Sequence, residues 1–297
     1  MRVGHIVNLF DPSCDVLRCV RELNLHSRHS HDLFVRDRHP DQDVCQFEEA
    51  PRGDAAAVIA AADVLIYHFA GLAADRHDPG KPSAFRSLHI TWEGGDGRFR
   101  TTMDTPLDDY RLLSASHVGA TDFLPEDRFR WLPDLLPLDG PYQFDPALLP
   151  VPAVSYIKHA GELREMDFGG ADHLDCSRTA HATVLARRRH LTTVVIDNVC
   201  DGHYGLAGQE AAIFGLPVVG FNHPRTLEAM EDWRSPGTEF PFIQAETVDE
   251  AARVAPRVAG EVTVPYRRAI RAWAEEWLDP RRLIGEYWDP FIDELAG

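Results

Sequence analysis

The sequence predicts an α/β protein built from two doubly wound, Rossmann-like domains. Apolar runs typical of buried strands alternate with segments whose apolar residues recur at helical spacing, and this alternation favours parallel sheets covered by helices. The length of 297 residues predicts about two domains. A proline-rich passage, "FDPALLPVPAVSYI", interrupts the pattern near the middle of the chain. We expect a cleft between the domains, a usual place for a small-molecule site.

The first half begins with an expected strand, "RVGHIVNLF", followed by a helix in which Val16, Cys19, Val20 and Leu23 recur at helical spacing. "HDLFVRD" reads as a second strand, and an Ala-rich helix then leads into a buried strand, "VLIYHF". "SLHITWEGGDGR" reads as a strand with a glycine loop. We place the first domain at residues 1–150, because the prolines that follow cannot form a continuous helix.

The second half repeats the alternation. Strands are expected at "AVSYIKH", "TTVVID" and "LPVVGF", with helices at "SRTAHATVLARR" and "GLAGQEAAIFG". We place this domain at residues 151–265 and a pair of closing helices at 266–297. The aromatic residues of the closing segment have helical spacing and are expected to pack between helices, not to form a sugar platform; they are Trp273, Trp277, Tyr287 and Trp288.

Composition excludes several classes of protein. The formal charge of −17 works against nonspecific binding to nucleic acid or anionic lipid, which both need an electropositive face. The five cysteines form no CxxC pair, which favours reduced thiols. No apolar run approaches the ~18 residues of a membrane span, and the N-terminus lacks the features of a signal peptide. We therefore expect a cytoplasmic protein without a membrane span.

The segment "DGHYGLAGQEAAIFGLPVVGF" carries the clearest chemistry. It reads as a glycine loop with Gly202, Gly205 and Gly208, then a helix that begins near Gly205 or Leu206, then a strand. The free amides and positive dipole end of such a helix can hold a diphosphate without lysine or metal. Glu210, about a turn and a half into the helix, could accept hydrogen bonds from two ribose hydroxyls. The alternative, purely structural interpretation is a glycine-rich turn with Glu210 as a solvated helix residue.

This segment resembles the donor-binding segment of GT-B glycosyltransferases, especially the retaining, family-4-like group, with its pattern "G(Y/F)G…EAMA.G.PVV". The loop "SLHITWEGGDGR" is similar to the "HGSD.R" loop of that group, and "SASHVGATDFLPEDRFRWLPDLLPLD" to the passage that leads into its linker. The end of the chain is similar to the closing helices, the last of which returns to the N-terminal domain. The resemblance covers most of the chain, in order.

The resemblance implies a glycosyltransferase that uses a nucleotide-diphosphate sugar, UDP- or GDP-linked, with retention and without metal. It implies that Glu210 binds ribose and that Gly205 and Leu206 meet the phosphates. His203 and Tyr204 belong to the same loop. The cleft loop of the N-terminal domain corresponds to Gly94, Gly95, Asp96 and Arg98.

The sequence departs from the family pattern in two places. The first acid of the family's pair falls on Gly202, so the adjacent Asp201 is our candidate for that catalytic role. The family's basic residues early in the C-terminal domain have no clear counterpart, and Lys158 and Arg164 are the candidates. A chain without these contacts could be a non-catalytic nucleotide-sugar binder. An epimerase of the same fold is also compatible with the pattern, as is a glycosyltransferase acting on modified bases in viral DNA, which the net charge disfavours.

Three further polar patterns are compatible with chemistry. Asp41 and Asp43 form a DxD, but one is expected by chance in so acidic a chain. His26, His29 and His31 are expected on a solvated surface at a helix end and turn. His68 ends a buried parallel strand, where a polar side chain points toward the site edge of the sheet. It is either a satisfied core histidine or a sugar or acceptor contact, and we take it as a catalytic candidate.

Overall fold

The structure is a computed structural model of the whole chain, and its described residues are 1–9, 15–37, 54–68, 80–87, 91–93, 98–100, 110–115, 127–146, 153–156, 168, 172–176, 181–197, 199, 205–222, 224–234 and 240–297. The contacts divide the chain into two compact units. The first unit comprises Met1–Leu136 together with Pro280–Gly297, and the second comprises Pro137–Asp279. Within the closing segment 266–297, residues 266–279 belong to the second unit and Pro280–Gly297 belongs to the first.

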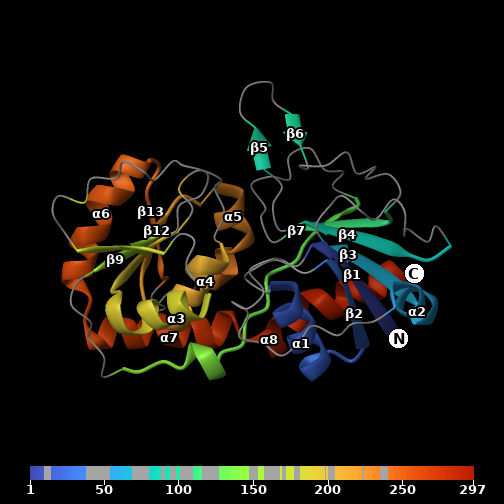
Figure 1. Cartoon of the computed structure of the whole chain (residues 1–297). Coiled ribbons are helices and arrows are strands. Elements are labelled where there is room, and N and C mark those ends of the chain that lie inside the picture. Colours follow the sequence, from blue (N-terminus) through green and yellow to red (C-terminus); the bar gives the residue numbers. More distant parts are fainter. Residues whose placement is uncertain are drawn as a thin grey trace. The chain divides into compact units, whose positions relative to one another are not determined.

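The first unit contains a six-stranded sheet in the order β2-β1-β3-β4-β7-β8, and every neighbouring pair is parallel (Figure 1). All five residues of β3 are buried, as expected for a central strand of a parallel sheet covered on both faces. A separate antiparallel pair joins β5 and β6. The strands are β1 Arg2–Leu9, β2 Ser30–Asp37, β3 Val64–His68, β4 Ser83–Ser87, β5 Thr91–Glu93, β6 Arg98–Arg100, β7 Leu112–Ala115 and β8 Phe129–Trp131.

The helices of the first unit cover the two faces of this sheet. Helix α1 (Asp15–His26) buries Val16, Cys19, Val20 and Leu23, which confirms the helical spacing predicted for them. On the other face, α2 (Ala55–Ala61) begins after the capping side chain of Asp54, which accepts a hydrogen bond from the amide of Ala56 at 3.0 Å. The Ala-rich helix before the third strand is therefore confirmed.

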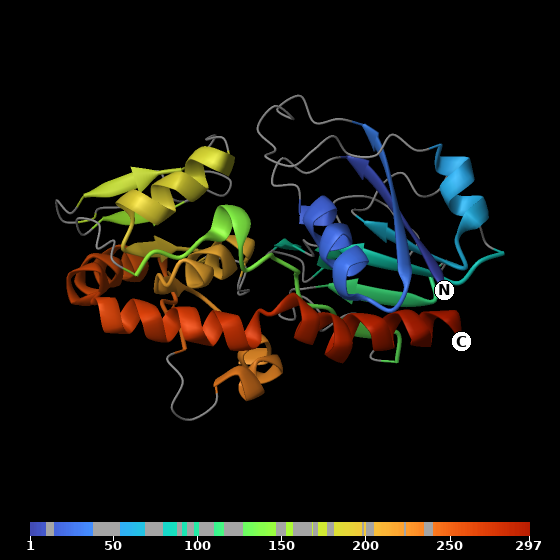
Figure 2. The ribbon, with the colours of Figure 1, turned by 90° about the horizontal axis from the view of Figure 1, so that it is seen from below.

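The end of the chain packs on the first unit. It forms α8 (Pro280–Leu283), the π-helical turn η5 (Ile284–Trp288) and α9 (Asp289–Ala296), which run along the strands (Figure 2). The indole Nε1 of Trp288 donates to the carbonyl of Pro133 at 3.0 Å, and the hydroxyl of Ser27 donates to Asp289 at 2.6 Å. A last helix that returns to the N-terminal domain is what the sequence resemblance implied.

The second unit contains a five-stranded parallel sheet in the order β10-β9-β11-β12-β13. Its core is formed by short apolar strands packed against α6, whose buried positions are alanines and Val258. The strands are β9 Val154–Tyr156, β10 His173–Asp175, β11 Val194–Ile196, β12 Val218–Gly220 and β13 Phe242–Gln244. The helical segments are η3 Gly140–Tyr142, α3 His181–Leu191, α4 Leu206–Ile213, α5 Pro224–Ala229, η4 Glu231–Arg234, α6 Val248–Glu261 and α7 Val264–Trp277.

The aromatic residues near the end of the chain are packing residues, as predicted. Trp273 and Trp277 are buried on α7 and contact Trp233, and the indole of Trp273 donates to the carbonyl of Trp233 at 2.7 Å. Trp288 is buried in the first unit, and Tyr287 makes an edge contact with Trp131. Within the described residues, no helix combines the length and apolarity of a membrane span.

Candidate functional site

The glycine segment of the second unit folds as predicted where the structure describes it. β11 ends at Ile196, Gly205 occupies the N-cap, and α4 begins at Leu206. Glu210 is the fifth residue of this helix. A glycine N-cap has no side chain with which to satisfy the free amides of the first turn. Another group must therefore accept their hydrogen bonds.

That group is the carboxylate of Asp197, which follows β11 directly. Its Oδ2 accepts hydrogen bonds from the amide of Gly205 at 2.8 Å and from the amide of Gly208 at 3.1 Å. A Cβ on Gly208 would lie 2.6 Å from the same oxygen. The glycines were expected to let the backbone approach a ligand, and in the structure they let it approach a buried carboxylate of the protein itself. Sequence reasoning missed Asp197, although an acid at the end of a parallel strand was a usable signal.

Glu210 lies at the centre of a buried hydrogen-bond network. Its side chain is 4% exposed. Oε1 accepts from the hydroxyl of Tyr142 at 3.0 Å and lies 2.7 Å from Nε2 of His181, and Oε2 accepts from Nη1 of Arg188 at 2.5 Å. A buried carboxylate is stable only when it is paired and hydrogen-bonded in this way. The interpretation of Glu210 as a solvated helix residue is therefore wrong.

This network joins η3 and α3 of the second unit to α4. Tyr142 ends η3, His181 begins α3, and Arg188 lies two turns further along α3. These three side chains occupy most of the acceptor positions of the carboxylate, of which there are about four. The three partners could not be found from spacing, because they are 22 to 68 residues away in sequence.

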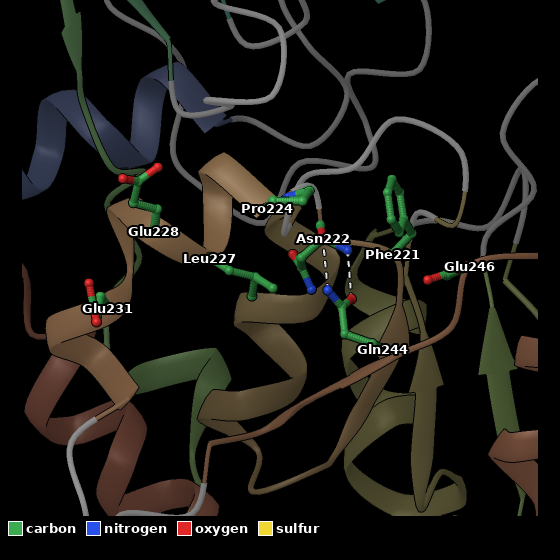
Figure 3. Close-up of a pocket in the computed structure, with 8 residues that line it drawn as sticks. All are labelled: Phe221, Asn222, Pro224, Leu227, Glu228, Glu231, Gln244 and Glu246. Carbon is green, nitrogen blue, oxygen red and sulfur yellow. Dashed lines mark hydrogen bonds between the residues drawn. The ribbon is translucent and has the colours of Figure 1, made fainter.

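A pocket of about 400 Å³ lies at the carboxyl ends of β12 and β13 (Figure 3). The backbone of Asn222 is held by Gln244, which accepts from the Asn222 amide and donates to its carbonyl, each at 2.8 Å. Glu228 and Glu231 lie to one side of Asn222, and Phe221 and Glu246 lie to the other. Ligands of open α/β sheets bind outside the carboxyl ends of the strands. The pocket is thus on the side of the sheet where a ligand is expected.

The first unit brings three histidines together. His5 on β1 lies between His68 on β3 and His31 on β2, with Nδ1 of His5 2.8 Å from Nε2 of His68 and Nε2 of His5 2.9 Å from Nδ1 of His31. All three rings are buried. The expectation of a solvated surface was wrong for His31, because residue 31 lies within β2 and its side chain shares a sheet face with the buried Leu33.

The environment keeps these histidines neutral. Burial lowers the pKa of His68 and of His5 well below the usual range, and the charge of Arg86 adds to the effect on His68. Burial and the neighbouring His29 lower the pKa of His31 to about 4. Arg86 itself is buried, donates to Asp134 at 2.7 Å and lies 5.0 Å from the ring of Trp288. Near neutral pH, the histidine cluster therefore carries no charge and can donate and accept hydrogen bonds.

Several predicted positions lie outside the described residues, and Arg98 is described only as the first residue of β6. The others are Asp41, Asp43, Gly94, Gly95, Asp96, Lys158, Arg164, Asp201, Gly202, His203 and Tyr204. Of the predicted site residues that are described, the second unit brings Gly205, Leu206 and Glu210 together on α4, and His68 lies in the first unit. Among the described residues, no group of three or more His, Cys, Asp or Glu side chains is arranged to hold a metal ion.

Comparison with solved structures decides the architecture. Over the full length of both chains, the protein is similar to an alpha-glucosyltransferase in complex with UDP, with a TM-score of 0.65 at 9% identity. The chain has the GT-B fold. An alpha-glucosyltransferase in complex with UDP and a mismatched 13-mer DNA matches this GT-B chain with a TM-score of 0.63 at 10% identity, again over 100% of both chains.

Another GT-B structure, the sucrose-phosphate synthase from Thermosynechococcus elongatus, matches over 100% of both chains with a TM-score of 0.60 at 9% identity. The sequence matches no protein-family model and no curated protein. At these identities the likeness concerns the fold, and it confirms the two Rossmann-like sheets that the sequence predicted.

Proposed function

We propose that this GT-B chain is a glycosyltransferase that moves a hexosyl or pentosyl residue from a UDP- or GDP-linked sugar to an acceptor. The observation that carries the proposal is the full-length likeness to glycosyltransferases whose solved structures contain UDP. The glycine loop, the start of α4 and Glu210 occur in the second unit in the order that the family pattern requires. Retention of the anomeric configuration is part of the proposal and comes from the sequence resemblance.

In the proposed mechanism, the second unit binds the donor. The amides at the start of α4, at Gly205 and Leu206, hold the diphosphate, with His203, Tyr204, Lys158 and Arg164 as further contacts. Glu210 binds the ribose. Fixed amides placed where negative charge develops on the leaving diphosphate stabilise the transition state, and this makes a divalent metal dispensable.

The first unit is proposed to bind the acceptor. His68 touches the reacting hydroxyl from the end of β3, and Gly94, Gly95, Asp96 and Arg98 contribute the acceptor loop. Asp201, four residues before Gly205 in the sequence, is the second proposed catalytic residue. Cys19 and Cys176 are buried thiols that form no disulfide, which fits the cytoplasmic setting proposed for the enzyme.

The test is release of nucleoside diphosphate from a panel of UDP-, GDP-, ADP-, TDP- and CDP-sugars, followed with and without magnesium and with chelator. We expect one base to support slow hydrolysis without any acceptor, at the same rate in chelator. Leu206→Ala is a mild change at the proposed phosphate site, and Leu191→Ala, at an exposed position on α3, is its control. No release from any donor by a folded sample would contradict the proposal.

A non-catalytic nucleotide-sugar binder is the second candidate, and one contact favours it over a transferase. Asp197 already accepts the hydrogen bonds of the Gly205 and Gly208 amides, so these amides are not available to stabilise the negative charge that develops on a leaving diphosphate, whereas the ribose contact proposed for Glu210 would remain. This candidate predicts saturable binding of a nucleoside diphosphate with no release of sugar from any donor. Measuring both binding and turnover with the same donor panel distinguishes a glycosyltransferase from a non-catalytic binder.

A further inference from the structure

The three buried histidines form a continuous hydrogen-bonded chain across neighbouring strands. β1 pairs with β2 on one side and with β3 on the other. His5, His31 and His68 share one face of this sheet, and their exposed fractions are 0%, 6% and 1%. The ring nitrogens of the two contacts are 2.8 and 2.9 Å apart, which are hydrogen-bond distances.

A neutral imidazole has one N–H donor and one acceptor nitrogen, and both nitrogens of His5 are engaged. His5 must therefore donate to one neighbour and accept from the other. The hydrogen bonds along the three histidines therefore all point in the same direction. When His31 donates to His5, His5 donates to His68, and Nδ1 of His68 carries a hydrogen. In the opposite direction, Nδ1 of His68 is a lone-pair acceptor and Nε2 of His31 carries the hydrogen.

The histidine chain ends in one ring nitrogen on each side. Nδ1 of His68 and Nε2 of His31 are buried atoms that have no hydrogen-bond partner among the described residues. Such orphaned polar atoms are rare in folded proteins and call for an explanation. Here they lie at the two ends of one chain, and His68 stands at the carboxyl end of its strand, where ligands of parallel sheets bind.

We propose that His31, His5 and His68 form a neutral proton relay that enables Nδ1 of His68 to act as the base toward an acceptor hydroxyl. The inference rests on the proposed function for the identity of the substrate. His68 is the catalytic residue, and His5 and His31 are positioning residues that act through it. None of these roles for His5 and His31 was evident from the sequence.

The relay step balances. The hydroxyl proton passes to Nδ1 of His68 as the hydroxyl oxygen bonds to the sugar carbon and the bond from that carbon to the diphosphate breaks. The Nε2 proton of His68 moves to Nδ1 of His5, and the Nε2 proton of His5 moves to Nδ1 of His31. The Nε2 proton of His31 passes to a water molecule of the solvent. Each ring gains one proton and loses one, so all three remain neutral and the chain direction is reversed.

The charges around the chain favour this neutral transfer over an imidazolium. Arg86 acts on both His68 and His5 and disfavours a positive ring. At His31, burial, His29 and the amino terminus disfavour a positive ring and outweigh Asp289 and Asp32, which favour one. All three rings are therefore held neutral.

The first test reads tautomers without any substrate. Long-range proton–nitrogen NMR spectra of the full chain at pH 7.5 identify which nitrogen of each ring carries hydrogen. We expect three neutral rings, and we expect His31→Phe to change the ratio of the two His68 tautomers by about fivefold, since one hydrogen bond that biases the direction is lost. His190→Gln, at an exposed position on α3, is the control and should leave the ratio unchanged. An unchanged His68 ratio in His31→Phe would overturn the relay.

The second test separates relay from structure. His5→Gln retains a donor and an acceptor but cannot pass a proton. With the donor sugar that is turned over, we expect kcat to fall by about 10²-fold, with KM unchanged and an altered pH profile. Wild-type kcat and pH profile in a folded His5→Gln would overturn the relay as the base. If no sugar donor is turned over by wild type, the proposed function fails, while the NMR coupling still decides whether the chain of histidines transmits its direction.

Discussion

Arg188 and Glu210 form a buried ion pair in which Nη1 of Arg188 lies 2.5 Å from Oε2 of Glu210. Both side chains are almost fully buried. The pair connects α3 to α4, and α4 carries the glycine N-cap of the proposed donor site. The position of α4 in the second unit therefore depends on an arginine that no glycosyltransferase pattern in the sequence singled out.

Removing Arg188 should strongly destabilise the second unit. Arg188→Met removes the cationic arginine partner of the buried Glu210 carboxylate, and we expect a loss of about 3–5 kcal/mol in the free energy of unfolding. Denaturant titration measures the loss. Arg282→Met, which breaks the exposed Arg282–Glu286 pair, is the control and should cost less than about 1 kcal/mol. Similar losses in the two variants would contradict the assignment of a buried pair.

Gly208 should tolerate no side chain. In Gly208→Ala the new Cβ would lie 2.6 Å from Oδ2 of Asp197 and 2.9 Å from the ring of Phe242, so we expect a destabilisation of about 1–3 kcal/mol. Gly260→Ala is a matched control, because no atom lies within 4 Å of its Cβ position in α6. That change should be neutral or stabilising by up to about 1 kcal/mol. A stable Gly208→Ala would show that α4 does not approach β11 as closely as described.

Asp197→Asn should affect stability and ligand binding in opposite directions. The variant retains an acceptor for the amides of Gly205 and Gly208 but loses the charge assistance, which costs about 1 kcal/mol in stability. It also removes a negative charge at the proposed diphosphate site, and we expect nucleoside diphosphate to bind tighter by up to about tenfold. Isothermal titration measures the affinity. Weaker binding in Asp197→Asn would place the diphosphate away from the start of α4.

The histidine chain should make the first unit sensitive to acid. Burial holds the pKa of His31 at about 4 and lowers those of His5 and His68 well below 6.5. Below pH 6.5 the unfolded chain binds protons that the folded unit does not, so the free energy of unfolding decreases as pH falls from 6.5 toward 4. Each neutral histidine contributes up to about 1.4 kcal/mol per pH unit.

His31→Asn tests this dependence, because it removes one of the three histidines. The free energy of unfolding should then change less steeply with pH, by up to about 1.4 kcal/mol per pH unit. Denaturant titrations at pH 4.5, 5.5, 6.5 and 7.5 measure the slope, and His190→Gln serves as the variant whose slope should stay near the wild-type value. An unfolding free energy that does not change between pH 4.5 and 6.5 would contradict three neutral buried histidines.

The fold was predictable because its signals are local in the sequence. The strand "VLIYHF" and the helix containing Val16 and Leu23 have periods that can be counted, and the structure confirms both. The beginning of α4 at Leu206 followed from the glycine loop before it. Local patterns of this kind determine which residues form elements and which faces are buried.

The site was less predictable because its contacts join residues that are distant in sequence. Glu210 was recognised as special, but its partners lie on η3 and α3, and nothing near Glu210 indicates them. His31 was expected on the surface because the histidine cluster was placed at a helix end and turn, whereas its register within β2 places it beside His5. Strand pairing brings such residues together, and pairing of parallel strands is not encoded in any short segment.

We propose that the second unit binds a nucleoside diphosphate, and a thermal-shift panel of UDP, GDP, ADP, TDP and CDP measures that binding. Each ligand is measured with magnesium and with chelator, against the matching nucleoside as a control without phosphate. At about a hundred times its Kd, a ligand stabilises by about 2.7 kcal/mol, which is roughly 5 to 10 °C in Tm for a unit of this size.

We expect such a shift with one diphosphate, equal in magnesium and in chelator, and a small or absent shift with its nucleoside. This result would also name the base for the turnover assays. No shift with any of the five diphosphates in a folded sample would contradict the donor site. The GT-B fold would then serve a different ligand.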